Sequence, residues 1–242
     1  MSIKIGIIGA MDVEVGLLKA KLESAQTKEA GGLTFVEGLL NKIPVVIVKS
    51  GVGKVNAALC TQRLILQMGV THIINTGIAG AMAKGLRVLD FVISTDALYH
   101  DMDATGFGYK ITEIPQMKTS AFPADGKMID AAKQAFDSLP ETKGHKLIAG
   151  RIATGDQFIS NAEIKAKIAR DCSPSCVEME GAAIAHAAYL NSVPFLIIRC
   201  MSDMADDSGE STYTFNEQSA AELSAKLVEK TVTLILPDDF EL

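Results

Sequence analysis

Residues 3–22 read IKIGIIGAMDVEVGLLKAKL. The apolar run at residues 3–8 is typical of a strand that is covered on both faces. After a short turn at Gly9 and Ala10, residues 12–22 carry the apolar period of a helix. A strand followed by a helix, repeated along a chain, is typical of an α/β fold, so this segment predicts the class of the whole protein.

The same alternation continues beyond residue 22. Further strands are predicted at residues 45–48, 72–75, 91–94, 147–153 and 194–200, and further helices at residues 54–68, 127–139, 162–170, 181–190 and 215–236. Residues 33–39 are expected to form a hairpin with 45–48, which makes the sheet mixed, and the polar stretch 100–125 predicts a long loop over a site. Because no linker or repeat divides the chain, we expect one domain, residues 1–242, built as a three-layer α/β/α sandwich around a central mixed β-sheet.

The composition limits the kinds of partner. The 242 residues include 29 Asp and Glu against 23 Lys and Arg, a formal net charge of −6, which argues against a surface that binds nucleic acid. The apolar fraction of 48% and the charged fraction of 21% exclude a disordered chain and indicate a sizeable core. Neither a secretory signal nor a membrane span is expected in the first residues.

The cysteines indicate a compartment and argue against a metal site. Cys60, Cys172, Cys176 and Cys200 are too few and too scattered for a disulfide framework, which favours a reducing cytoplasm. Cys172 and Cys176 lie close in sequence, but no second Cys or His pair follows at the spacing of a zinc site. We therefore expect no metal and no other cofactor.

Polar and glycine-rich residues lie at six predicted strand ends, where ligands bind in open α/β sheets: residues 9–14, 51–54, 76–80, 154–158, 177–180 and 199–203. This arrangement predicts one composite pocket. The segment Gly51-Val52-Gly53-Lys54 lacks the third glycine of a dinucleotide-binding loop. Val48 and Val55 stand where an ATP-binding phosphate loop needs a glycine and a Ser or Thr, so both nucleotide-binding loops are excluded.

Seven blocks follow one another along nearly the whole chain: GIIGAMDVEV (6–15), SGVGKVNAA (50–58), NTGIAGA (75–81), YHDMDATGFGY (99–109), TGDQFI (154–159), VEMEGAAIAH (177–186) and VPFLIIRCMSDMAD (193–206). Together they resemble the bacterial 5′-methylthioadenosine/S-adenosylhomocysteine nucleosidases of the nucleoside phosphorylase/nucleosidase superfamily. The resemblance implies a nucleoside phosphorylase-like fold and a homodimer. It also implies hydrolysis of the N-glycosidic bond of methylthioadenosine, adenosylhomocysteine and 5′-deoxyadenosine to adenine and the 5′-substituted ribose, in methionine salvage.

The resemblance assigns the reaction to three acidic residues. Asp203, in an Arg-x-x-Ser-Asp match that includes Ser202, matches the general acid that protonates adenine N7, a role that needs a raised pKa. Glu180 matches the acid that accepts hydrogen bonds from both ribose hydroxyls, and Glu14 the acid that activates the attacking water. From the residues alone, the favoured interpretation of Asp203 is a helix N-cap, and that of Glu14 is a solvated acid in a first helical turn.

The other matched residues are implied to line the substrate pocket. Phe158 would stack on adenine, and the backbone of Phe158 and Ile159 would read the edge of the base. The remaining implied contacts are Met179 on the ribose, Arg199 holding Glu180, Met11, Val52 and Phe215 around the ribose and its 5′-substituent, and Phe107 and Pro115 from the neighbouring subunit.

One substrate contact departs from the family. Ile78 stands where the family usually has serine in Asn-Thr-Gly-Ser-Ala-Gly, so one hydrogen bond near the acid or the ribose is lost. Gln157, where small residues are common, and the long segment between Asp203 and Phe215 indicate an altered lid over the pocket.

Three other functions stay open. A purine nucleoside phosphorylase would need cations for phosphate, whereas the first loop offers Asp12 and Glu14, and Asn75 and Ile78 replace the expected arginine and serine. An aminofutalosine nucleosidase needs the same three carboxylates and differs in the 5′-substituent of its substrate. A nucleoside-binding sensor would need neither an acid nor a base.

Overall fold

The computed structural model describes residues 3–206 and 208–235. In that part of the chain the strands are β1 (Ile5–Gly9), β2 (Glu23–Ala30), β3 (Leu33–Leu40), β4 (Ile43–Lys49), β5 (His72–Ala81), β6 (Phe91–Tyr99), β7 (Ala121–Pro123), β8 (Leu147–Thr154), β9 (Cys176–Glu178) and β10 (Phe195–Asp203). The helices are α1 (Asp12–Ala20), α2 (Lys54–Met68), α3 (Gly126–Ser138), α4 (Ala162–Cys172), α5 (Gly181–Leu190) and α6 (Gly209–Val232). Within the described residues, no helix combines the length and the apolar character needed to cross a membrane.

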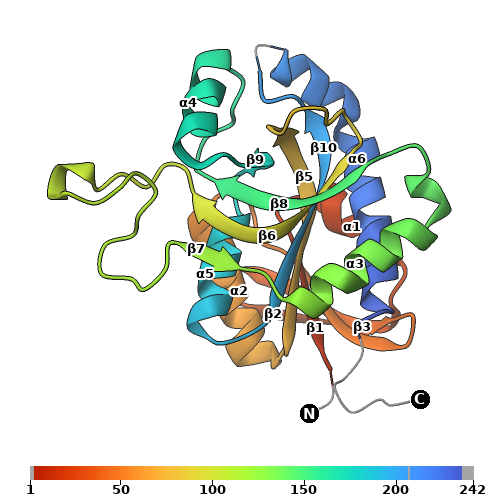
Figure 1. The fold of residues 1–242 in the computed structure, drawn as a ribbon. Helices are drawn as coiled ribbons and strands as arrows, with labels where there is room; N and C mark the ends of the chain where they lie inside the picture. Colours follow the sequence, from red (N-terminus) through yellow and green to blue (C-terminus); the bar gives the residue numbers. More distant parts are fainter. Residues whose placement is uncertain (1–2, 207, 236–242) are drawn as a thin grey trace.

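The strands form one mixed sheet, and five of them close on themselves (Figure 1). β5 pairs in parallel with β10, β10 pairs antiparallel with β6, and β6 pairs in parallel with β8. β8 then pairs with β9, and β9 returns to β5. We call these five strands the strand ring. β1 joins the ring at β5, and β4, β3 and β2 continue the sheet outward from β1.

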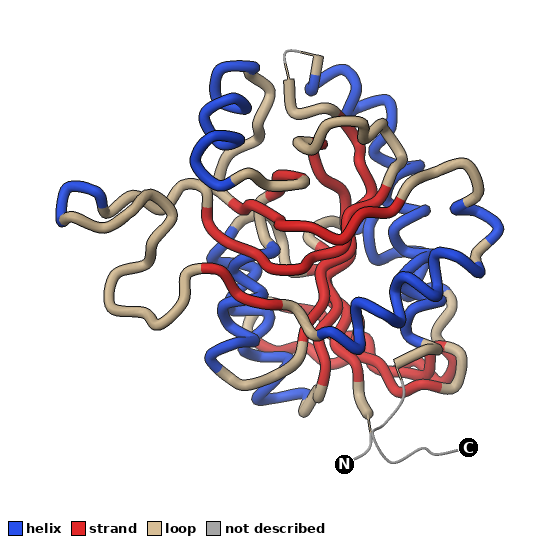
Figure 2. The backbone as a smooth tube through the Cα atoms, viewed as in Figure 1, coloured by secondary structure: helices blue, strands red, loops and turns tan. Residues whose placement is uncertain are grey.

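Helices cover both faces of the sheet (Figure 2). α2 and α5 pack on one face, around a core that includes Ile73 and Ile184. α1, α3 and α6 pack on the other face, around a core that includes Ile74 and Val228. Ile73 and Ile74 are neighbours in β5 that serve opposite faces, because side chains alternate along a strand. The expected three-layer α/β/α sandwich with a central mixed sheet is therefore confirmed.

The expected hairpin and the expected long loop are both present. Leu40 pairs with Ile43, and the two residues between them, Asn41 and Lys42, have φ angles of 50° and 68°. Positive φ at both positions is the turn geometry that matches the twist of paired strands. The chain after β6 forms an arm that projects from the body, with the short 3-10 turn Thr105–Phe107 in it (Figure 1).

β2, β5 and α6 differ from the sequence-based expectation, and the three-residue strands β7 and β9 were not predicted either. β2 was not predicted, because it is an edge strand that pairs only with β3 and is exposed along most of its length, so it has no apolar alternation. β5 continues through residues 76–81, which were expected to turn, because their backbone pairs with β10 and β9. α6 begins at Gly209 and not at residue 215, in a polar segment that carries no clear helical period.

Candidate active site

A cavity of about 440 Å³ lies where β1, β5, β9 and β10 end, which is within the roughly 300–1,000 Å³ of small-molecule sites. The loops after β4 and β8 and the first turns of α6 complete its wall. The lining residues are Ala10, Met11, Glu14, Val52, Ile78, Ala79, Gly80, Phe158, Val177, Glu178, Met179, Glu180, Ser202, Asp203, Tyr213 and Thr214. Within the described residues, no three His, Cys, Asp or Glu side chains gather in a way that could hold a metal ion.

Glu14 lies in the first turn of α1 and points inward. Its Oε2 accepts hydrogen bonds from the backbone amides of Ala10 (2.6 Å) and Met11 (3.0 Å), and its Oε1 accepts one from Ile78 (3.1 Å). Burial raises the pKa of Glu14, although the nearby Arg199 and these amides oppose the rise. Glu14 is therefore a fixed, buried carboxyl group and not a solvated acid of a helix terminus.

Arg199 on β10 is a fully buried cation beside three glutamates. Its Nη2 donates to Glu178 Oε2 and, at 2.6 Å, to Asn75 Oδ1. The same nitrogen lies 3.7 Å from Glu180 Oε2, and Nη1 lies 4.0 Å from Glu14 Oε1. We expected Arg199 to hold Glu180, whereas its direct hydrogen bond is to Glu178, and its effect on Glu180 and Glu14 is that of a nearby charge.

Gly77 makes this arrangement possible. A Cβ atom at this position of β5 would overlap Arg199 Nη1 and lie 2.5 Å from Glu14 Oε1. Because Gly77 has no side chain, the Arg199 guanidinium from β10 and the Glu14 carboxylate from α1 can both lie close to β5. The glycine, which the sequence places at a predicted strand end, has a packing function here.

Both carboxylate oxygens of Glu178 accept hydrogen bonds from other groups of the protein. Its Oε1 accepts from the Thr154 hydroxyl, and its Oε2 accepts from the backbone amides of Glu180 (3.1 Å) and Gly181 (2.7 Å) in addition to Arg199. Glu178 thus orients the start of α5, where Glu180 is the N-cap residue.

Glu180 is the carboxyl group that remains available at this end of the cavity. Its Oε1 accepts from the Gly53 amide at 2.9 Å, and Gly53 has a φ of 98°, a conformation that favours glycine. Burial, followed by the charge of Glu178, raises the pKa of Glu180 to about 7 against the opposing charge of Arg199. Because hydrogen bonds to a carboxylate favour its ionised form, a ligand that donates hydroxyl groups would return Glu180 to the charged state.

Asp203 ends β10 and is almost completely buried. Its Oδ1 accepts from the Ala205 amide at 2.7 Å, and its Oδ2 accepts from the Ser202 hydroxyl at 2.9 Å. Burial raises the pKa of Asp203, partly opposed by these two hydrogen bonds. Asp203 does not cap a helix, because α6 begins only at Gly209.

The comparisons with known proteins agree on one family. The family model of the phosphorylase superfamily matches residues 4–233. A curated 5′-methylthioadenosine/S-adenosylhomocysteine nucleosidase from Colwellia psychrerythraea is 45% identical, and the match covers 93% of each chain. The chain belongs to this nucleosidase family.

Solved structures show the same fold. The crystal structure of the Colwellia psychrerythraea nucleosidase in complex with adenine is 41% identical and has a TM-score of 0.93, over 97% of this chain and 96% of that one. A futalosine hydrolase from Helicobacter pylori is 29% identical, with a TM-score of 0.90 over 96% of this chain and 98% of that one. The fold is therefore nucleoside phosphorylase-like, as the sequence blocks of the nucleosidase family implied.

Apolar side chains form most of the remaining wall in this member of the nucleosidase family. Phe158 and Tyr213 meet edge to face, with ring centroids 5.5 Å apart. Met11, Val52 and Met179, all expected from the sequence, line the same cavity. The structure thus brings together residues from the beginning, middle and end of the chain.

Ile78 stands where the family usually has serine, and this substitution changes the wall of the cavity. Its side chain lines the cavity and is 7% exposed, so a polar group is replaced by an apolar one at the wall. Its backbone amide still donates to Glu14. The substitution therefore leaves the hydrogen bond that positions Glu14 unchanged.

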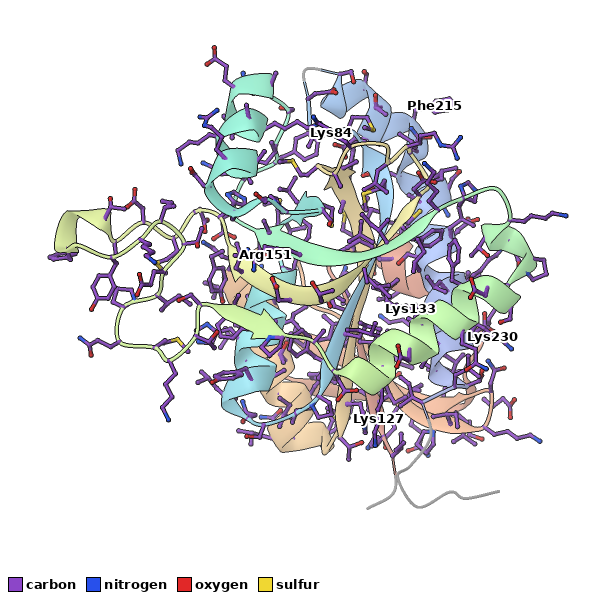
Figure 3. The ribbon with its side chains drawn as sticks, viewed as in Figure 1. Lys84, Lys127, Lys133, Arg151, Phe215 and Lys230 are labelled. Carbon is purple, nitrogen blue, oxygen red and sulfur yellow. The ribbon has the colours of Figure 1, made fainter. Side chains whose placement is uncertain are left out.

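Tyr213, and not Phe215, is the aromatic residue of α6 in the cavity. Phe215 is 87% exposed at the outer surface of α6 (Figure 3). The Tyr213 hydroxyl donates to Glu217 Oε1 at 2.7 Å and lies 3.7 Å from Met11 Sδ. Phe215 and not Tyr213 was expected from the sequence, because this contact was taken from the resemblance to the family. Residues two positions apart lie on different faces of a helix, so the correct helix start would have separated Tyr213 from Phe215.

In addition to Arg199 and Phe215, three expected contacts lie outside this cavity. Ile159 lines a recess of about 30 Å³ that shares Phe158 and Asp203 with it. Phe107 is 88% exposed in the projecting arm, and Pro115 is half-buried in the same arm. Neither Phe107 nor Pro115 lines the cavity of its own chain.

Proposed function

We propose that this chain hydrolyses the N-glycosidic bond of methylthioadenosine and adenosylhomocysteine, and of 5′-deoxyadenosine, in methionine salvage. The observation that carries the proposal is that Glu14, Glu180 and Asp203, from three separate elements, are buried in the wall of one cavity. Burial raises the pKa of each, which is expected of catalytic acids and bases and not of surface carboxylates. The name of the Colwellia relative and the adenine in its structure support the same reaction.

The three acids divide the work of the reaction. Asp203, whose pKa is raised by burial, gives its proton to adenine N7 while the bond between C1′ and N9 breaks and its electrons pass to adenine. Glu180 accepts hydrogen bonds from the ribose hydroxyls, and its negative charge favours the cationic sugar. Glu14 accepts a proton from water as the water oxygen bonds to C1′. The products are adenine and the 5′-substituted ribose.

The charges of the cavity favour water over phosphate as the attacking group. None of the described residues that line the cavity is a lysine or an arginine. The Arg199 guanidinium lies behind the wall and is bonded to Glu178 and Asn75. A phosphate ion in the cavity would lie beside carboxylates, and none of the described lining residues would supply a positive charge to bind it. This supports a hydrolase and not a phosphorylase.

Adenine release from methylthioadenosine is expected to have the same rate with and without inorganic phosphate. Inosine should react at least about 100-fold more slowly, because a site that reads a 6-amino purine leaves hydrogen-bonding groups unpaired against a 6-oxo group. The measurement is chromatography of the released base, with adenosylhomocysteine, 5′-deoxyadenosine and aminofutalosine in the same series. Aminofutalosine is included because a futalosine hydrolase shares the fold.

Each alternative function gives a different result in this assay. A rate that rises with phosphate, with ribose 1-phosphate as product, would identify a phosphorylase. Comparable turnover of inosine and methylthioadenosine would remove the adenine assignment. Tight binding of the nucleosides without release of base would identify a sensor.

We also propose that the enzyme is a homodimer in which Phe107 and Pro115 enter the partner's pocket. Phe107 is 88% exposed although it is a large aromatic residue. Val55, Leu59 and Leu66 are also exposed, and their spacing places them along one face of α2. Exposed apolar side chains that form a continuous stripe are typical of a protein interface.

Activity per chain should fall on dilution below the dimer dissociation constant, because the pocket would lose the residues of the partner. The measurement is initial rate against protein concentration, with light scattering on the same samples. Concentrating the diluted enzyme should restore the rate. A monomer that keeps full activity would show that the pocket needs no partner.

A cytoplasmic location is part of the same proposal. All four cysteines are free and buried: Cys60, Cys172, Cys176 and Cys200. Unpaired cysteines are typical of proteins from a reducing compartment.

A further inference from the structure

The N-terminus of α2 is held by carboxylates from two other parts of the site. Its N-cap residue, Gly53, has no side chain to accept a hydrogen bond, and its first turn has no acidic residue. The Gly53 amide donates to Glu180 Oε1 at 2.9 Å, and the adjacent Lys54 amide donates to Asp156 Oδ1 at 2.9 Å. Two consecutive amides therefore bind one acid from the start of α5 and one from the loop after β8.

Asp156 is tied a second time through the side chains of Lys54 and Asp101. Lys54 Nζ lies 2.6 Å from Asp101 Oδ2 and 3.6 Å from Asp156 Oδ2. The Asp156 amide donates to the same Asp101 oxygen at 3.1 Å. Lys54 Nζ also lies 5.6 Å from the centre of the Tyr99 ring. We call Lys54, Asp101 and Asp156 the Lys54 clasp.

The clasp joins segments that the proposed reaction uses for different parts of the substrate. Asp156 lies two residues before Phe158, which faces the base, and the Gly53 amide beside Lys54 holds Glu180, which faces the ribose. The clasp residues do not themselves line the cavity. Any effect that they have on the substrate therefore passes through Phe158 and Glu180.

We propose that Lys54, Asp101 and Asp156 are positioning residues that set the Phe158 loop at a fixed distance from the Glu180 carboxylate. The proposal rests on the proposed function, because it needs adenine at Phe158 and ribose at Glu180. A nucleoside spans both groups, so it benefits from their fixed separation, whereas free adenine contacts only the first. Preorganisation of this kind increases affinity by reducing the ordering that binding requires.

The test compares a whole nucleoside with its base. Asp156→Ala should weaken binding of a methylthioadenosine C-nucleoside, whose carbon–carbon glycosidic bond cannot be hydrolysed, by about tenfold in calorimetry, and binding of adenine by less than about threefold. The KM for methylthioadenosine should rise about tenfold while kcat changes less than about threefold. Asp156→Asn keeps an oxygen that can accept from the Lys54 amide, so it should lose only about threefold in nucleoside affinity.

The matched control is Lys21→Met. Lys21 Nζ lies 2.5 Å from Glu229 Oε2 in a similarly exposed ion pair that is not part of the cavity wall, so its loss should change neither affinity. Equal weakening of adenine and nucleoside by Asp156→Ala would overturn the proposal, because Asp156 would then only support the adenine loop. No weakening of the nucleoside would overturn it as well.

Two further comparisons distinguish a failure of this proposal from a variant that does not fold and from a failure of the proposed reaction. If Asp156→Ala does not fold, Asp156→Asn and Lys54→Met, which removes only side-chain bonds, serve for the same comparison. A wild-type protein that binds the C-nucleoside but does not cleave methylthioadenosine contradicts the proposed function and leaves the clasp comparison valid. A wild-type protein that binds neither ligand overturns both.

Discussion

Asp203→Asn is expected to lower kcat by about 10²–10⁴-fold while adenine still binds, because an amide cannot give a proton to the departing base. The structure favours a clean comparison. Asparagine Oδ1 can accept from the Ala205 amide as Asp203 Oδ1 does, and its amide group can donate to the Ser202 hydroxyl oxygen, which now donates to Asp203. The measurement is the single-turnover rate together with calorimetric binding of adenine.

The pH dependence supplies an independent check on this role. Because burial raises the pKa of Asp203, the acid stays protonated to a higher pH than an exposed aspartate would. The wild-type kcat/KM should fall as the pH rises through that pKa, and Asp203→Asn should lack this fall. A near wild-type single-turnover rate in Asp203→Asn would place the acid at another residue.

Gly77→Ala is expected to destabilise the fold by about 3–5 kcal/mol and to abolish activity together with it. The added methyl group would displace the Arg199 guanidinium from its place between Glu178 and Glu14. Breaking a buried ion pair in this way costs about that amount, because charges stay buried without their partner. The measurement is the free energy of unfolding in urea, with the initial rate of adenine release on the same preparation.

Gly16→Ala is the control for the glycine substitution. Gly16 lies in the exposed part of α1, and a Cβ atom there would meet nothing within 4 Å. Alanine is the better helix former, so this variant should be stabilised by about 0.5–1 kcal/mol and stay active. If Gly77→Ala unfolded at the same urea concentration as the wild type and kept its rate, the buried arginine would not be a fixed part of the site.

The parts of the fold that could be predicted are those in which burial follows a regular period. The buried strands are continuous apolar runs, and the helices on both faces repeat apolar residues at the helical spacing, so the class and the layers followed from the sequence. β2 has no such pattern, because an exposed edge strand is held by backbone pairing with β3. The packing function of Gly77 could not be predicted, because a sequence does not show which side chains will approach a strand.

The site was predictable to the extent that its residues lie at strand ends. Glu14, Glu180 and Asp203 come from such positions and line one cavity. Phe215 was taken from the resemblance, whereas in the structure Tyr213, two positions earlier on α6, lines the cavity and Phe215 is exposed. The sequence Glu178-Met179-Glu180 does not show which of its two glutamates binds Arg199. Only the three-dimensional arrangement shows that the direct hydrogen bond is to Glu178.

The strand ring determines when, during translation, the chain can form its active site. β5 ends at Ala81, but its partner β10 begins at Phe195, so the edge of β5 that β10 will cover emerges from the ribosome long before β10 is made. An uncovered apolar strand edge can pair with other chains, and chaperones shield such edges. Because Asp203 ends β10, the nascent chain closes the ring and receives its proposed acid in the same step. A chain that ends before β10 therefore lacks both the strand that closes the ring and the proposed acid, and it is not a shorter enzyme.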